Sequence, residues 1–127
     1  MKTARNTNQA FWMFLPAGLD EVFDMVRVDQ SDKSFDIWLD EKKQKSYEDR
    51  FNHQIVARGY TEYVTIQDYP LRGRPTFLHM RKNKWWNKLT GEIFSYQIEL
   101  PNEDGTRLSA EFVAFLKDEG GVDGSVD

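Results

Sequence analysis

Alternating apolar and polar residues predict a β-hairpin in the first third of the chain. Residues 19–28 show the two-residue repeat of a strand, and the polar run 29–34 after it is typical of a turn. A second strand is predicted at 35–41, where alternate residues are apolar and are expected to face the core. The mixed charges of the next segment, 42–52, lack periodicity and indicate a solvated connection with few contacts.

Three further strands are predicted between residues 63 and 100. The first, 63–69, is rich in β-branched and aromatic residues, and two prolines and a glycine follow in the turn 70–75. The second strand is predicted at 77–86, and the third, 93–100, shows a clean alternation of apolar and polar side chains. Because turns join these strands in sequence, we expect them to pair as a meander.

Two helices are predicted beside the strands. Residues 9–15 form a short and strongly apolar segment whose aromatic side chains, including Phe14, are expected to pack on the sheet. In residues 106–118 apolar side chains recur at helical spacing, and either Thr106 or Ser109 is expected to cap this helix.

These elements predict a small α+β fold with one domain over residues 9–118. Its small antiparallel sheet, made of the N-terminal hairpin and the three-stranded meander, is expected to pack with the short N-terminal helix and the C-terminal helix. At 127 residues the chain is long enough for one such domain. The polar start, 1–8, and the glycine-rich acidic end, 119–127, are predicted to be flexible tails.

Composition narrows the class of protein. The chain has no cysteine, which excludes a disulfide framework and cysteine-ligated zinc and fits a reducing compartment. No apolar run is long enough for a signal peptide or a membrane span, so we expect a soluble, cytoplasmic protein with no membrane partner. The formal net charge of -4 opposes binding of a polyanion by the whole surface, so any nucleic-acid contact has to be local.

Positive charge is concentrated in one stretch of this acidic chain. Between Asp68 and Glu92 there are six basic residues, two adjacent tryptophans and no carboxylate. Such a basic and aromatic stretch is typical of surfaces that bind phosphates or stack on bases. It equally fits a solvated strand whose lysines protect a sheet edge and whose tryptophans fill the core. The candidate contact residues are Arg72, Arg74, Arg81, Lys82, Lys84, Trp85, Trp86 and Lys88.

Sequence signatures of catalysis and metal binding are missing. The two histidines, His53 and His79, lie on separate segments, and no nucleophile, phosphate-loop or metalloprotease motif occurs. His79 is expected to be a partly buried neutral imidazole with one hydrogen bond. A group of acidic residues lacks metal-ligand spacing and is interpreted as a solvated face: Asp36, Asp40, Glu41, Glu48 and Asp49. We therefore expect neither an enzyme nor a bound cofactor.

The run from Ile66 to Lys88, I-Q-D-Y-P-L-R-G-R-P-T-F-L-H-M-R-K-N-K-W-W-N-K, carries a family resemblance. With T-G-E-I after it and G-T-R-L-S-A-E-F-V-A-F-L-K further on, it resembles the N-terminal-region proteins of ISAon-type bacterial insertion sequences, over roughly residues 10–118. It is more remotely similar to the zinc-ribbon module of ISL-type transposases. Asn87–Gly91 stands where that module has a cysteine knuckle, so the resemblance implies a zinc-ribbon-like meander without zinc.

The resemblance implies a non-catalytic accessory protein in DNA transposition. Its partners would be the DNA of insertion-sequence ends and a separate catalytic transposase subunit, and it would take no small-molecule substrate. The candidate residues between Arg72 and Lys88 would then contact DNA. An alternative is a protein–protein adaptor that docks on the catalytic subunit without touching DNA. An RNA-binding regulator fits the same basic stretch.

Overall fold

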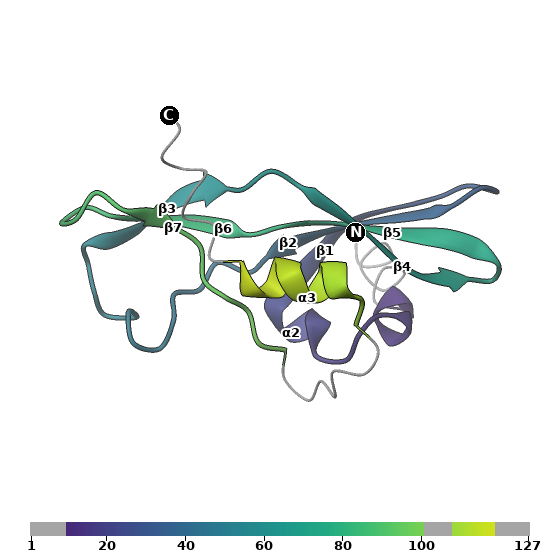
Figure 1. Cartoon of the computed structure of the whole chain (residues 1–127), viewed down its shortest axis with the longest axis horizontal. Helices are drawn as coiled ribbons and strands as arrows, with labels where there is room; N and C mark the ends of the chain where they lie inside the picture. The colour runs from purple at the N-terminus through teal and green to yellow at the C-terminus, as the bar shows by residue number, and fades with distance from the viewer. Residues whose placement is uncertain (1–9, 101–107, 119–127) are drawn as a thin grey trace.

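The computed structural model describes residues 10–100 and 108–118. Two β-sheets follow one another along the long axis of the molecule, and helices α2 and α3 lie on one side of the strands (Figure 1). The predicted tails, 1–8 and 119–127, lie outside the described residues. In chain order the elements are η1 (Ala10–Phe14), α2 (Leu19–Val22), β1 (Phe23–Gln30), β2 (Phe35–Glu41), β3 (Ile55–Tyr60), β4 (Val64–Leu71), β5 (Arg74–Arg81), β6 (Asn83–Asn87), β7 (Ile93–Phe94) and α3 (Ala110–Lys117).

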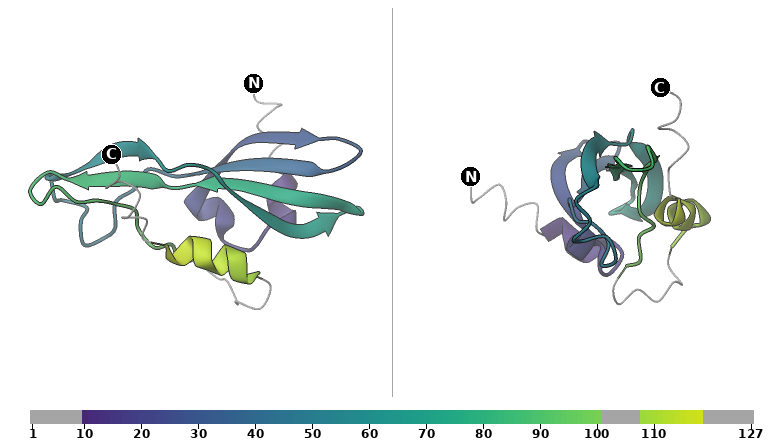
Figure 2. Two further views of the ribbon diagram at one scale, coloured as in Figure 1. Left: turned by 45° about the horizontal axis from the view of Figure 1, so that its top comes forward. Right: turned by 90° about the vertical axis from the view of Figure 1, so that its left-hand side faces the viewer.

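The first sheet contains four strands in the order β1-β2-β5-β4. Its two hairpins, β1–β2 and β4–β5, are antiparallel, whereas β2 and β5 are parallel neighbours. This parallel pairing places both hairpin turns at the same end of the molecule (Figure 2). The predicted small α+β fold is confirmed, but this sheet is mixed rather than purely antiparallel, because the two hairpins meet through β2 and β5.

The second sheet contains β3, β6 and β7, and its pairings are antiparallel. Only Lys82 separates β5 from β6, so the predicted strand 77–86 runs from one sheet into the other. The predicted meander is therefore divided between two sheets. Its third strand is shorter than expected, because β7 has two residues and residues 95–100 continue without strand structure.

The main core lies between the first sheet and the helices. Alternate residues of β2 and β5 face this core, as the apolar pattern predicted for β2, and α3 covers them from the opposite side. Residues 95–100 also contribute to it through Ile98 and Leu100. The side chains of the core that come from β2, β5 and α3 are Ile37, Leu39, Leu78, Met80, Phe112, Phe115 and Leu116.

Helix α3 begins where a side chain binds one of its free amide groups. The hydroxyl of Ser109 accepts a hydrogen bond of 3.1 Å from the backbone N–H of Phe112. Ser109 is therefore the N-cap, which agrees with one of the two predicted starts. The other predicted start, Thr106, lies outside the described residues.

The N-terminal segment differs in part from the prediction. Leu15 is buried in the core, but Phe14 is 55% exposed, so the prediction that Phe14 packs on the sheet is wrong. Residues 19–22 form α2 instead of the start of a strand, and two acidic residues in its first turn favour a helix N-terminus. The strand begins only at Phe23.

Candidate nucleic-acid interface

The predicted contact residues do not form one continuous surface. Alternation along β5 places Met80 in the core and Arg81 on the opposite face. The alternation breaks at the junction with β6, where Lys82 and Asn83 are both buried. The eight candidate residues therefore lie in four places: one hairpin turn, the face of β5 opposite the core, internal positions and the second sheet.

Arg81 is bound to a carboxylate of the neighbouring strand. Its Nε and Nη2 atoms donate hydrogen bonds of 2.9 Å each to the two carboxylate oxygens of Asp40. The rings of Tyr60 and Tyr63 lie 4.1 and 4.6 Å from the guanidinium carbon. The hydrogen bonds with Asp40 raise the pKa of Arg81 above its ordinary value. Because its charge is already neutralised, Arg81 would have to lose this pair to bind a phosphate.

Lys82 and Trp85 are internal residues. Lys82 is 3% exposed, and its Nζ donates hydrogen bonds to the carbonyl oxygens of Tyr96, Leu116 and Asp118. Trp85 is 5% exposed and lies 6.1 Å from the ring of Tyr96, measured between ring centroids. Burial removes both residues from the set of predicted DNA contacts, because neither ammonium nor indole faces solvent. For Trp85 the core alternative is therefore the one that the structure supports.

Arg72 and Arg74 lie at the turn between β4 and β5. Nη1 of Arg74 donates a hydrogen bond of 2.6 Å to the backbone oxygen of Ser31, in the turn of the other hairpin. The guanidinium of Arg74 also lies 4.9 Å from the ring centroid of Phe35. Arg74 thus connects the two hairpin turns, and Arg72 is exposed beside it.

The remaining candidates lie on one face of the second sheet. Strand pairing places Val56 of β3 and Ile93 of β7 on either side of Trp86. The guanidinium of Arg58 lies 5.3 Å from the ring centroid of Trp86, and Lys84 lies two residues before Trp86 on the same face. We call Val56, Arg58, Lys84, Trp86 and Ile93 the outer face of the second sheet.

The positive charges of this outer face are not paired with a carboxylate of any described residue. Within the described residues, Arg58 and Lys84 form no ion pair, and neither does Lys88 in the turn after β6. Arg58 was missed in the sequence because a single arginine in a short segment gives no local signal. Only the pairing of β3 with β6 brings it to Trp86.

The opposite face of the second sheet is acidic. An open hollow of about 920 Å³ lies there, and its lining includes Asp49, Glu92 and Glu99. The hydroxyl of Tyr96 in this hollow donates a hydrogen bond of 2.8 Å to Asp49, and burial together with this bond raises the pKa of Tyr96 to about 12. The two faces of one sheet therefore differ in charge: acidic side chains line the hollow, and Arg58 and Lys84 lie on the outer face.

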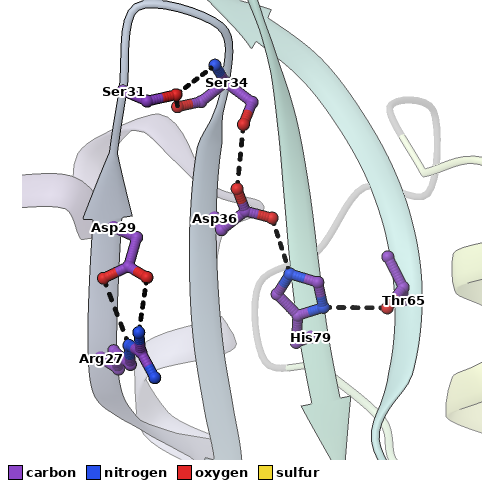
Figure 3. A network of polar contacts seen from close by, with 7 residues as sticks. All are labelled: Arg27, Asp29, Ser31, Ser34, Asp36, Thr65 and His79. Carbon is purple, nitrogen blue, oxygen red and sulfur yellow. Dashed lines mark hydrogen bonds and ion pairs between the residues drawn. The ribbon is translucent and has the colours of Figure 1, made fainter.

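His79 belongs to a polar network across the first sheet (Figure 3). Its Nε2 lies 2.8 Å from a carboxylate oxygen of Asp36, and its Nδ1 lies 2.8 Å from the hydroxyl of Thr65. Ser34 donates a further hydrogen bond of 2.9 Å to Asp36, and the ring of Trp38 stacks on His79. The histidine is partly buried, as predicted, but has two partners rather than one. The network links β2, β5 and β4 and leaves neither ring nitrogen available to a ligand.

Two of the acidic residues interpreted as a solvated face are buried. Asp40 is 9% exposed and holds Arg81, and Glu41 is 8% exposed. A carboxylate oxygen of Glu41 accepts a hydrogen bond of 2.8 Å from the backbone N–H of Asn83. The interpretation is wrong for these two residues, because they connect β2 to the chain around β5 and β6. No group of potential metal ligands occurs within residues 10–100 and 108–118.

Stability should depend on pH through Glu41. Burial raises the pKa of Glu41 above its ordinary value of 4.5, so the folded protein binds this proton more tightly than the unfolded chain does. The contribution of Glu41 to stability therefore falls as the pH rises from that ordinary value towards the raised one. Glu41→Gln keeps an oxygen acceptor for Asn83 and removes this titration. Urea unfolding should show that the free energy of unfolding of the variant, relative to that of the native protein, is higher at about pH 7 than at about pH 4. If this difference between the two proteins is the same at both pH values, the prediction is wrong.

In the part of the chain that the structure describes, no helix is long and apolar enough to cross a membrane. Comparisons with family models, with curated proteins and with solved structures find no match to this chain.

Proposed function

We propose that this chain is a non-catalytic DNA-binding protein whose contact surface is the outer face of the second sheet. The observation that carries this proposal is the placement of the Arg58 guanidinium over Trp86, with Lys84 beside it on the same face. Lys88, in the turn directly after β6, adds a further positive charge. Under this proposal the chain has no catalytic activity and binds DNA without a cofactor.

Charge and chemistry both support this surface. A lysine or arginine that is not paired with a carboxylate can bind a DNA phosphate and release the counterion condensed there. Arg58 and Lys84 make no ion pair within the described residues. The half-buried ring of Trp86 holds the guanidinium of Arg58 in place by a cation–π contact and provides an aromatic surface next to it. The acidic hollow on the other face would repel the same ligand, which gives the sheet one binding side.

The resemblance to insertion-sequence proteins supports a narrower role. Under this proposal the chain is an accessory protein of a transposase, it binds the ends of the mobile element in the cytoplasm, and the catalytic transposase subunit is its protein partner. Of the candidate contact residues from the basic stretch, those proposed to contact DNA are Arg72, Lys84, Trp86 and Lys88, whose side chains are exposed or half-buried. Arg58, which lies outside that stretch, is added to them.

DNA binding should weaken when either cation of the outer face is neutralised. Arg58→Gln and Lys84→Gln should each lower the affinity for a duplex of about 30 base pairs to a similar extent whatever its sequence. Each lost phosphate contact should also reduce the slope of log K against log salt by about 0.9. Fluorescence anisotropy at several salt concentrations measures both quantities. Circular dichroism should show that both variants remain folded.

Lys117→Gln is the matched control for these variants. Lys117 is an exposed lysine on α3, on the helical side of the molecule (Figure 1), so the same change of charge should leave the affinity and the slope unchanged. An equal loss in all three variants would mean that only the net charge matters. The outer face would then not be the contact surface.

A protein–protein adaptor is the second candidate function, and one observation favours it. Met13 and Phe14, neighbours on η1, are 78% and 55% exposed. Adjacent exposed apolar side chains are typical of a protein contact. Protein that binds the catalytic transposase but shows no salt-dependent binding of terminal DNA, alone or in that complex, would reject DNA binding and support the adaptor.

A further inference from the structure

The turn between β4 and β5 has an unusual residue at its tip. Leu71 and Arg74 are paired, so the connection has two residues, Arg72 and Gly73. Their φ angles are +52° and +80°. Two central residues with positive φ match the turn type that suits the right-handed twist of a hairpin, in which asparagine, aspartate or glycine is preferred at the first position.

Arginine is a poor choice for this backbone. Left-handed φ angles bring the Cβ atom of an ordinary residue too close to its own carbonyl oxygen, and a long side chain offers no local hydrogen bond in return. Arg72 is the only non-glycine residue with positive φ within residues 10–100 and 108–118. An asparagine would relieve the strain while keeping the same turn.

The surrounding structure holds the turn in place without using the Arg72 side chain. Arg74 connects this turn to the turn of the first hairpin through Ser31 and packs on Phe35. The hydroxyl of Ser31 in turn accepts hydrogen bonds of 3.1 Å from the backbone N–H groups of Lys33 and Ser34. The two turns lie at the same end of the molecule (Figure 2). The Arg72 guanidinium is exposed and forms no ion pair with any described residue.

We propose that Arg72 is a phosphate-contact residue, and that the β4–β5 turn is a second DNA-binding point at the opposite end of the strands from the outer face. This inference rests on the proposed function. Backbone strain persists where the surrounding structure enforces it, and it is concentrated at binding sites. A guanidinium presented at the tip of a hairpin fits phosphate oxygens by two parallel hydrogen bonds.

The spacing of the two binding points sets the length of DNA. Arg72 and Lys84 are twelve residues apart along β5 and β6, which at about 3.3 Å per residue corresponds to about 40 Å. One turn of duplex DNA rises about 34 Å. A duplex that contacts both points must therefore be longer than about one helical turn.

Arg72→Asn tests the inference because it separates stability from binding. Asparagine suits the positive φ, so the variant should melt a few degrees above the native protein. Its affinity for a duplex of about 30 base pairs should fall about tenfold, with a slope of log K against log salt smaller by about 0.9. Arg72→Lys keeps the charge, so it should retain the slope and show no rise in melting temperature.

The outcomes distinguish this inference from the proposed function. If Arg72→Asn binds as the native protein does while Arg58→Gln and Lys84→Gln lose affinity, the turn is not a binding point but the outer face still is. A melting temperature of Arg72→Asn at or below that of the native protein would overturn the argument from strain, and with it the inference. If the native protein binds neither duplex nor single-stranded DNA, the proposed function and this inference both fail.

Discussion

Lys82→Met should lower the free energy of unfolding by about 3–5 kcal/mol. Lys82 is 3% exposed, and its ammonium donates hydrogen bonds to the carbonyl oxygens of Tyr96, Leu116 and Asp118. Two of these carbonyls, of Leu116 and Asp118, end α3, so Lys82 binds the negative end of that helix to the junction of the two sheets. Methionine has a similar shape but no donor. The variant would remove the ammonium donor from all three carbonyls, although that of Leu116 keeps its hydrogen bond from the backbone N–H of Ile98. It would also leave Glu41 without the positive charge that lowers its pKa.

Urea unfolding followed by circular dichroism measures this loss, and Lys84→Met is its matched control. Lys84 comes from the same basic stretch but lies half-buried on the outer face without an ion pair within the described residues. A substitution of this kind should change the free energy of unfolding by no more than about 0.5 kcal/mol. If Lys82→Met is as stable as Lys84→Met, the cap on α3 contributes nothing and the buried ammonium has another role.

Phe112→Ala should cost about 3–5 kcal/mol of stability. Phe112 is 2% exposed and lies in the main core between α3 and the first sheet. Removing its ring leaves a cavity that the neighbouring strands cannot close, because they are fixed by their own pairing. Since small domains have total stabilities of about 5–15 kcal/mol, the variant should be partly unfolded at moderate temperature.

Phe14→Ala is the control for this prediction, because it removes the same ring from a position that is 55% exposed. Its free energy of unfolding should stay within about 0.5 kcal/mol of the native value. Thermal unfolding of both variants measures the contrast. An equal loss of stability in the two variants would contradict this prediction. It would mean that the exposed ring of Phe14 stabilises the fold as much as the buried ring of Phe112 does.

The elements of this fold were largely predictable from local pattern. The strand predicted at 35–41 is β2, Phe35–Glu41, and its apolar side faces the core. The predicted C-terminal helix is α3, with Ser109 as its cap. Alternation and helical spacing depend on residues a few positions apart, so the sequence carries them directly. The α+β class follows from the elements alone.

The arrangement of the strands was not predictable in this way. The parallel pairing of β2 with β5 joins residues such as Phe35 and Thr76, which are far apart in the chain. The division of the predicted meander at Lys82 depends on the carbonyls of α3, which lie more than thirty residues later. A local pattern shows which face of a strand is apolar, but it does not show which strand will cover or pair with that face.

The candidate site shows the same division between sequence and tertiary structure. The sequence by itself determined that positive charge and tryptophan are concentrated between Asp68 and Glu92 in an acidic chain. Tertiary structure decided how each charge is used: Arg81 binds Asp40, 41 residues earlier, and Lys82 binds the end of α3. It also brought Arg58 to Trp86 and left Lys84 on the same open face. The physical reason is that the partner of a charged side chain is fixed by strand register and helix docking, which are long-range contacts.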